Sequence, residues 1–134
     1  MHLLATAVLA AALHGSFGVT LSAADLARVG ASPREASWGT GSWTLTVTGD
    51  RWTLRQSGGL YGNAVDRGTV GAGGRFVVRL VDGFSHNEDL GRLSWRETGA
   101  GLVFVPVERA RNQDIAQILS ARPWRRLRAV TGSA

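Results

Sequence analysis

The clearest pattern in the sequence is a strict alternation of apolar and polar residues over positions 43–55. Trp-Thr-Leu-Thr-Val-Thr is followed by Gly49-Asp50, and the alternation then resumes in Arg-Trp-Thr-Leu-Arg. A period of two is typical of a β-strand with one buried face. Gly49 and Asp50 tolerate the positive φ of a tight turn. The pattern predicts an antiparallel hairpin whose inner face carries Trp43, Leu45, Val47, Trp52 and Leu54.

Shorter segments with the same alternation predict further strands on both sides of this hairpin. Leu93 and Trp95 share the predicted inner face of one such strand, and Phe76 that of another. Sequential strands joined mostly by short turns favour closure, because closure removes the exposed edge strands. We therefore predict a mainly β chain, an eight-stranded antiparallel up-and-down barrel with one or two short helices. Its strands are expected over 15–21, 42–48, 51–56, 65–70, 75–81, 91–97, 102–107 and 123–129.

Helix signals occur at two places in the chain. Ser22 fits an N-cap, and Asp25 lies in the first turn that follows it. Pro33 is interpreted as a stop signal inside a connector over 31–40. The two predicted helices span 23–29 and 112–120.

Length and composition fit one domain with a core of its own. The chain has 134 residues, of which 44% are hydrophobic. It has no cysteine, so disulfides and cysteine metal sites are excluded. The three histidines have no metal-ligand spacing, and we expect neither a metal nor a cofactor. The expected organisation is an apolar segment over 1–14, a single barrel domain over 15–130 and a tail over 131–134.

The apolar run at residues 3–13 has the length of a signal-peptide core. No basic residue precedes it, and it is too short to span a bilayer, so we expect no stable membrane insertion. Three interpretations remain: a targeting signal, a buried N-terminal helix, or a start trimmed from a longer polypeptide. The compartment is therefore left open between cytoplasmic and secreted.

All basic charge comes from arginine, and its excess is concentrated near the C-terminal end. Residues 1–107 hold 9 arginines and 8 acids, whereas residues 108–134 hold 6 arginines and 2 acids. Nucleic-acid binding is not expected, because no aromatic platform shares a face with these arginines. We interpret the arginines of 122–128 as outward side chains that pair with Glu97, Glu108 or solvent.

Gly41-Ser-Trp43 resembles the Gly-x-Trp motif that opens an early strand in lipocalin-like (calycin) barrels. The order of strand, leucine-containing helix, Gly-x-Trp hairpin and a closing Arg-Pro-Trp-Arg-Arg segment resembles the small bacterial type of this family over roughly residues 15–128. The resemblance implies that Trp43 closes one barrel end and that Arg126, or else Arg125 or Arg128, packs on it through a cation–π contact. The helix before Gly41 departs from secreted lipocalins, so their ligands are not transferred.

The leading functional hypothesis is binding of a small hydrophobic molecule inside the predicted barrel. The chain has five tryptophans, which is more than a filled core of this size needs. The expected ligand-binding residues are Trp52, Leu54, Tyr61, Phe76, Val78, Trp95 and Phe104.

Two alternatives to a binding protein stay open. One is a motif-poor barrel enzyme, such as a cyclase acting on a polyketide or polyene, which works by shape and exclusion of water. His86 or Glu88 would then be a candidate general base, and no other catalytic residue is indicated. The other is a structural accessory domain with a filled barrel. The pattern specifies no oligomeric state.

Overall fold

The computed structural model describes residues 13–58, 65–69, 75–77, 92–108 and 114–128, which form two antiparallel sheets and three helices. The larger sheet has the strand order β4-β3-β2-β1-β8, and the smaller one has the order β5-β6-β7. The chain is therefore mainly β, as predicted. The elements are β1 (Gly15–Leu21), α2 (Ala23–Arg28), α3 (Pro33–Gly39), β2 (Gly41–Thr48), β3 (Arg51–Ser57), β4 (Val65–Thr69), β5 (Arg75–Val77), β6 (Arg92–Thr98), β7 (Gly101–Glu108), α4 (Asp114–Ser120) and β8 (Arg125–Arg126).

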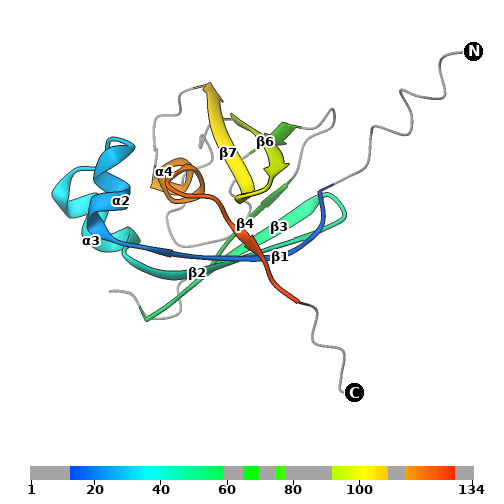
Figure 1. Cartoon of the computed structure of the whole chain (residues 1–134), viewed down its shortest axis with the longest axis horizontal. Coiled ribbons are helices and arrows are strands. Elements are labelled where there is room, and N and C mark those ends of the chain that lie inside the picture. Colours follow the sequence, from blue (N-terminus) through cyan, green and yellow to red (C-terminus); the bar gives the residue numbers. More distant parts are fainter. Residues whose placement is uncertain (1–12, 59–64, 70–74, 78–91, 109–113, 129–134) are drawn as a thin grey trace, which may run out of the picture.

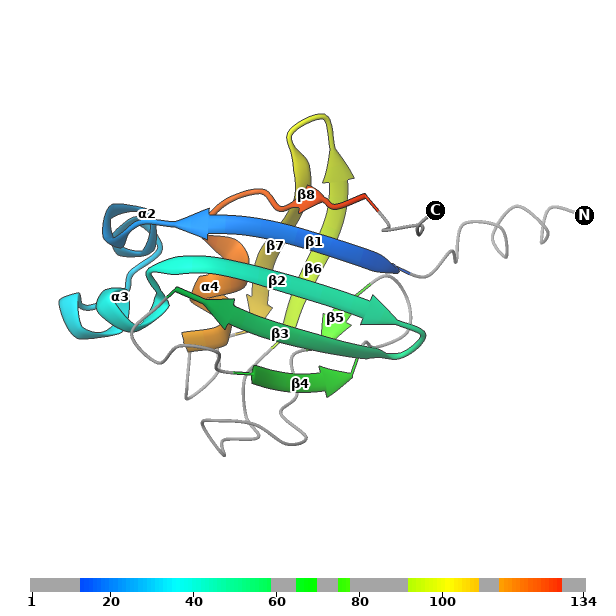
Figure 2. The same cartoon turned by 90° about the horizontal axis from the view of Figure 1, so that it is seen from below.

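The two sheets form layers that face each other. Figure 1 shows β6, β7 and α4 on one side of the larger sheet, with α2 and α3 at one end of it. Figure 2 shows that β6 and β7 run across the direction of β1, β2 and β3. Crossed sheets of this kind bury the inner face of each layer against the other.

The predicted central hairpin is confirmed. In β2 and β3, Leu45 pairs with Leu54 and Val47 pairs with Trp52. These four side chains are at most 2% exposed, while the threonines between them face outward. Because side chains alternate across a strand, the apolar pattern alone fixed which face is buried.

The predicted closed barrel is wrong. The described strands form two separate sheets, and no hydrogen-bonded ladder joins β4 to β5 in this part of the chain. In the described residues, β4 pairs only with β3, and β5 pairs with β6 over Arg75–Val77. A one-sided apolar pattern requires a second layer over that face. The apolar pattern does not distinguish a closed sheet from two facing sheets, so the number of strands was not enough to predict a closed barrel.

The C-terminal segment links the two layers on the other side. Trp124 exchanges two backbone hydrogen bonds of 2.8 Å with Leu102 of β7, and Arg125 and Arg126 then pair with β1. Pro123 has no N–H group and cannot extend the ladder with β1. Of the strand predicted over 123–129, the structure shows β8 at Arg125–Arg126, with Trp124 paired to β7 instead; residue 129 lies outside the described residues.

The helices confirm two predictions and correct a third: α2 and α4 lie within the predicted spans 23–29 and 112–120, of which residues 112–113 lie outside the described part of the chain. Ser22 caps α2, with Asp25 completing a reciprocal capping box as the third helical residue. The predicted connector over 31–40 contains a helix, α3, with Ser32 as its N-cap. The Ser32 hydroxyl accepts from the Glu35 N–H (3.1 Å), and the Ser32 N–H donates to the Glu35 carboxylate (2.7 Å). Pro33 occupies the first turn, where a missing N–H costs nothing, so it starts this helix instead of stopping one.

The core between the layers collects apolar side chains from both sheets and from all three described helices. Its one fully buried polar side chain on β3 is Gln56, which donates to the carbonyls of Trp38 (2.9 Å) and Thr40 (3.1 Å). These bonds tie the end of α3 to the larger sheet. Leu13, the first described residue, is 2% exposed and belongs to this core, whereas the rest of the predicted segment 1–14 lies outside the described residues except for the exposed His14.

Candidate functional site

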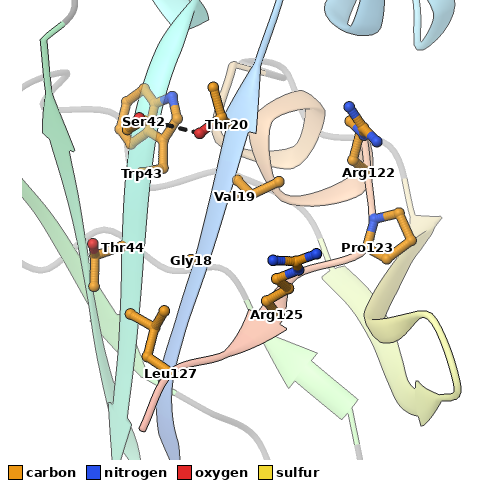
Figure 3. Close-up of a pocket in the computed structure, with 10 residues that line it drawn as sticks. All are labelled: Gly18, Val19, Thr20, Ser42, Trp43, Thr44, Arg122, Pro123, Arg125 and Leu127. Carbon is orange, nitrogen blue, oxygen red and sulfur yellow. Dashed lines mark hydrogen bonds between the residues drawn. The ribbon is translucent and has the colours of Figure 1, made fainter.

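A groove of about 490 Å³ lies where β1 and β2 meet the C-terminal segment 122–127 (Figure 3). We call it the β1 groove. In Figure 3, two arginines and a proline lie on the side of β1 away from β2, and the hydroxyl groups lie on the side of β2. Its lining is Gly18, Val19, Thr20, Ser42, Trp43, Thr44, Arg122, Pro123, Arg125 and Leu127.

The hydroxyl side of the groove follows from strand alternation. Thr20, Ser42 and Thr44 occupy positions between the buried residues of β1 and β2, so they face away from the core. Thr20 pairs with Ser42 across the two strands, and their hydroxyl oxygens lie 3.2 Å apart, within hydrogen-bonding distance. The groove therefore holds hydroxyl groups whose spacing is fixed by the sheet.

The opposite end of the groove is apolar. Leu127 lies over Gly18, where an added Cβ would come within 3.2 Å of a Leu127 methyl carbon. Because Gly18 has no side chain, Leu127 can pack directly on the backbone of the sheet at this position. Leu127 remains 42% exposed, so the part of its side chain that faces away from the sheet can contact a ligand.

The two arginines of the groove differ in their partners. An Arg122 terminal nitrogen lies 3.8 Å from a carboxylate oxygen of Asp25, a distance typical of an ion pair. Arg125 pairs through its backbone with Gly18, which places its side chain on the same sheet face as the groove. Among the described residues, the Arg125 guanidinium has no hydrogen-bonding or ion-pair partner. The groove thus presents two guanidinium groups: Arg122 has a carboxylate partner that it shares with Arg28, and Arg125 has no partner among the described residues.

Asp25 anchors Arg122 to the start of α2. Its carboxylate accepts the Ser22 N–H at 2.8 Å and also contacts Arg28, and the residue is only 7% exposed. The hydrogen bond from the Ser22 backbone N–H is the main cause that holds the pKa of Asp25 below its ordinary value. Burial opposes this lowering, and the Ser22 hydroxyl, Arg122 and Arg28 reinforce it. The ionised form of Asp25 is therefore the form that the fold stabilises.

Replacing Asp25 with asparagine is expected to lower the free energy of unfolding by about 1 kcal/mol near neutral pH. The asparagine amide oxygen can still accept the Ser22 N–H, but the negative charge of the carboxylate is lost. A lowered pKa in the folded state contributes stability above the ordinary aspartate pKa of about 4, and this contribution is lost as pH falls through the folded pKa. The Asp25→Asn variant should therefore lose less stability on acidification below about pH 4 than the native chain. Urea unfolding over a pH series measures both effects.

Asp50→Asn is the matched control for this experiment. Asp50 lies in the β2–β3 turn with its side chain 83% exposed, so the substitution removes the same charge without a cap. Equal acid sensitivity in Asp25→Asn and the native chain would contradict the role given to the Asp25 carboxylate.

Several predicted ligand-binding residues are part of the packed core. Trp52, Leu54 and Phe104 are at most 2% exposed and belong to the same buried cluster. Trp95 is half-buried and pairs with Phe104 across β6 and β7; its indole N–H is buried and has no acceptor among the described residues. Tyr61 and Val78 lie outside the described residues, as does the side chain of Phe76. Binding of a ligand between the layers stays a prediction.

Arg126 makes a different contact from the one implied by the lipocalin-like resemblance. Its guanidinium lies 4.6 Å from the centroid of the Phe17 ring, and it donates to the His14 carbonyl and to Glu97 at 2.9 Å each. Trp43 instead donates its indole N–H to the Gly39 carbonyl at 2.8 Å. The predicted stacking of Arg126 on Trp43 is therefore replaced by stacking on Phe17. The predicted pairing of a C-terminal arginine with Glu97 is confirmed for Arg126.

Comparisons of the chain with protein families, with curated proteins and with solved structures found no match. The resemblance to lipocalin-like domains stays a prediction that rests on short motifs. In the part of the chain that the structure describes, no helix is long and apolar enough to cross a bilayer. The same residues include no group of three or more His, Cys, Asp or Glu side chains that could hold a metal ion.

Proposed function

We propose that this chain is a binding protein that holds a small amphipathic molecule in the β1 groove. The supporting observation is the convergence of hydroxyl groups, guanidinium groups and an exposed leucine on one hollow of about 490 Å³. Ligand sites for small molecules usually have volumes of about 300–1,000 Å³ and combine apolar walls with a few placed polar groups. The β1 groove lies within this range of volumes and combines the apolar side chains of Val19, Pro123 and Leu127 with hydroxyl and guanidinium groups.

The proposal keeps the small-molecule ligand expected from the sequence but moves it to another place. Trp52, Leu54 and Phe104 pack against other core side chains, and burial of such aromatic and aliphatic groups stabilises the fold by itself. A ligand in the β1 groove needs no displacement of these residues. Among the predicted residues that the structure describes, only Trp43, which was expected to close the barrel, belongs to the lining.

Binding is favoured over acid–base catalysis by the chemistry of the lining. The described residues around the groove supply hydroxyl and guanidinium groups but no carboxylate or imidazole. General acid–base catalysis relies mostly on His, Glu, Asp or Lys with a pKa near the working pH, and arginine stays charged. The cyclase and accessory-domain hypotheses have no comparable observation in their favour.

The experiment that tests this proposal fills the groove with a larger side chain. Two fluorescent dyes with the same aromatic frame serve as probes: neutral N-phenylnaphthylamine and its anionic relative anilinonaphthalene sulfonate. We expect saturable binding of at least one dye to the native chain, weakened about tenfold in Thr44→Trp because the indole occupies the ligand volume. Fluorescence titration gives both dissociation constants.

Thr53→Trp is the matched control for groove filling. Thr53 is a half-buried outward threonine on β3, on the same sheet face as Thr44 but outside the groove lining. It should bind the dyes within about twofold of the native chain. Lack of saturable binding, or equal effects of the two tryptophan substitutions, would contradict the proposal.

A further inference from the structure

The β1 groove has an uneven distribution of charge that indicates what kind of ligand it prefers. Two arginines in neighbouring segments have partners that hold their guanidinium groups. Arg126 is held by Glu97, the His14 carbonyl and the Phe17 ring, and Arg28 contacts Asp25. Arg125 differs, since its guanidinium has no partner among the described residues.

A guanidinium without a partner is an effective binding group for an oxyanion. Its planar set of N–H donors matches two oxygens of a carboxylate, sulfate or phosphate group. Arg122 adds a second guanidinium to the groove, but it shares its charge with Asp25 at 3.8 Å. Arg125 is therefore expected to carry most of the attraction to an anion, and Arg122 less.

The remainder of the lining indicates what the anionic group is attached to. Thr20 and Ser42 offer hydroxyl groups that can donate to ligand oxygens. Pro123 and the 42% exposed Leu127 supply apolar surface within the same groove. Figure 3 shows Leu127 at one end of the groove and Arg122 at the other, with Arg125 between them along the segment.

We propose that the β1 groove selects a small organic anion, in which one carboxylate, sulfate or phosphate ester group is joined to a short apolar body. Arg125 binds the charged group, Thr20 and Ser42 donate hydrogen bonds to it, and Leu127 covers the apolar body. This inference rests on the proposed binding function and adds the charge and shape of the ligand.

The test compares the two dyes in the native chain and in Arg125→Gln. The dyes share one aromatic frame and differ in the sulfonate group, so their ratio of affinities isolates the contribution of the charge. We expect the anionic dye to bind about tenfold more tightly than the neutral one. Arg125→Gln should weaken the anionic dye by roughly 5- to 30-fold and leave the neutral dye within about twofold.

Arg51→Gln controls for the loss of one positive charge. Arg51 lies at the β2–β3 turn with its side chain 80% exposed, and it does not line the groove. It should change both affinities by less than about twofold. If Arg51→Gln and Arg125→Gln weaken the anionic dye equally, or if Arg125→Gln weakens both dyes alike, the inference is overturned.

Competition then identifies the anion. Octanoate, octyl sulfate and octyl phosphate carry the same chain, and the one that displaces the dye best names the preferred head group. Octanol is the neutral competitor, and displacement by octanol at the same concentration as the acids would overturn the inference. A neutral dye that binds in a Thr44→Trp-sensitive way without any preference for anions would leave the proposed function standing and reject the anion alone.

Discussion

Replacing Trp124 with alanine is expected to lower the free energy of unfolding by about 3–5 kcal/mol, the usual cost of truncating a large aromatic in a core. Trp124 is 0% exposed, and its indole N–H donates to the Leu119 carbonyl at 2.9 Å. Its backbone also forms the bridge between β7 and the segment that continues into β8. The truncation therefore opens a cavity where the two layers join. Urea unfolding followed by circular dichroism measures the loss.

Trp124→Phe separates packing from the hydrogen bond. Phenylalanine keeps most of the apolar volume but leaves the Leu119 carbonyl without its donor, so we expect a smaller loss of about 1–2 kcal/mol. If Trp124→Ala cost less than about 1 kcal/mol, Trp124 would not be the buried link between the layers that its contacts indicate.

The second large effect is expected at Gly101, the first residue of β7. Its φ is +129°, and an added Cβ would lie 2.3 Å from the Trp124 carbonyl oxygen. Gly101→Ala thus imposes backbone strain and a clash with backbone atoms that no side-chain rotation relieves. We expect a loss of about 3 kcal/mol or more, seen as a fall in melting temperature of about 10 °C.

Gly99→Ala provides a control from the same turn. An added Cβ at Gly99 meets nothing within 4 Å, and its φ is not in the positive region. Its stability should change by less than about 1 kcal/mol. Similar losses of stability at both glycines would show that the whole turn is sensitive to substitution. That result would contradict a specific effect of the contact between Gly101 and Trp124.

Local patterns in the sequence predicted the elements more accurately than their assembly. The alternation over 43–55 fixed the hairpin and its buried face, and Ser22 with Asp25 fixed the start of α2. The signal for α3 was also present, since Ser32 and Glu35 have the spacing of a capping box around Pro33. The helix was missed because Pro33 was interpreted as a stop signal. Closure of a barrel, in contrast, depends on whether β4 forms a hydrogen-bonded ladder with β5, and no local pattern encodes that pairing.

The candidate site was harder to predict because its parts come from distant segments. Thr20, Ser42 and Thr44 carried only the signal of an outward strand face. Arg122 and Arg125 join them because Pro123 interrupts the ladder and Trp124 turns toward β7. The partner of Arg126 was missed for a related reason. Its pairing opposite Phe17, and not opposite Trp43, is set by the register of β8 on β1.

The partners of β1 on its two edges, β2 and β8, lie at very different separations from it along the sequence. Ser16 contacts Thr46 of β2 at a separation of 30 residues, whereas Arg126 reaches the His14 carbonyl across 112 residues. Loop-closure entropy makes contacts between remote segments slow to form. During synthesis, β1 can therefore pair with β2 early, whereas Phe17 and Gly18 gain their β8 partners only after Arg125 and Arg126 have been made. That interval is when this chain is most exposed to edge-to-edge aggregation.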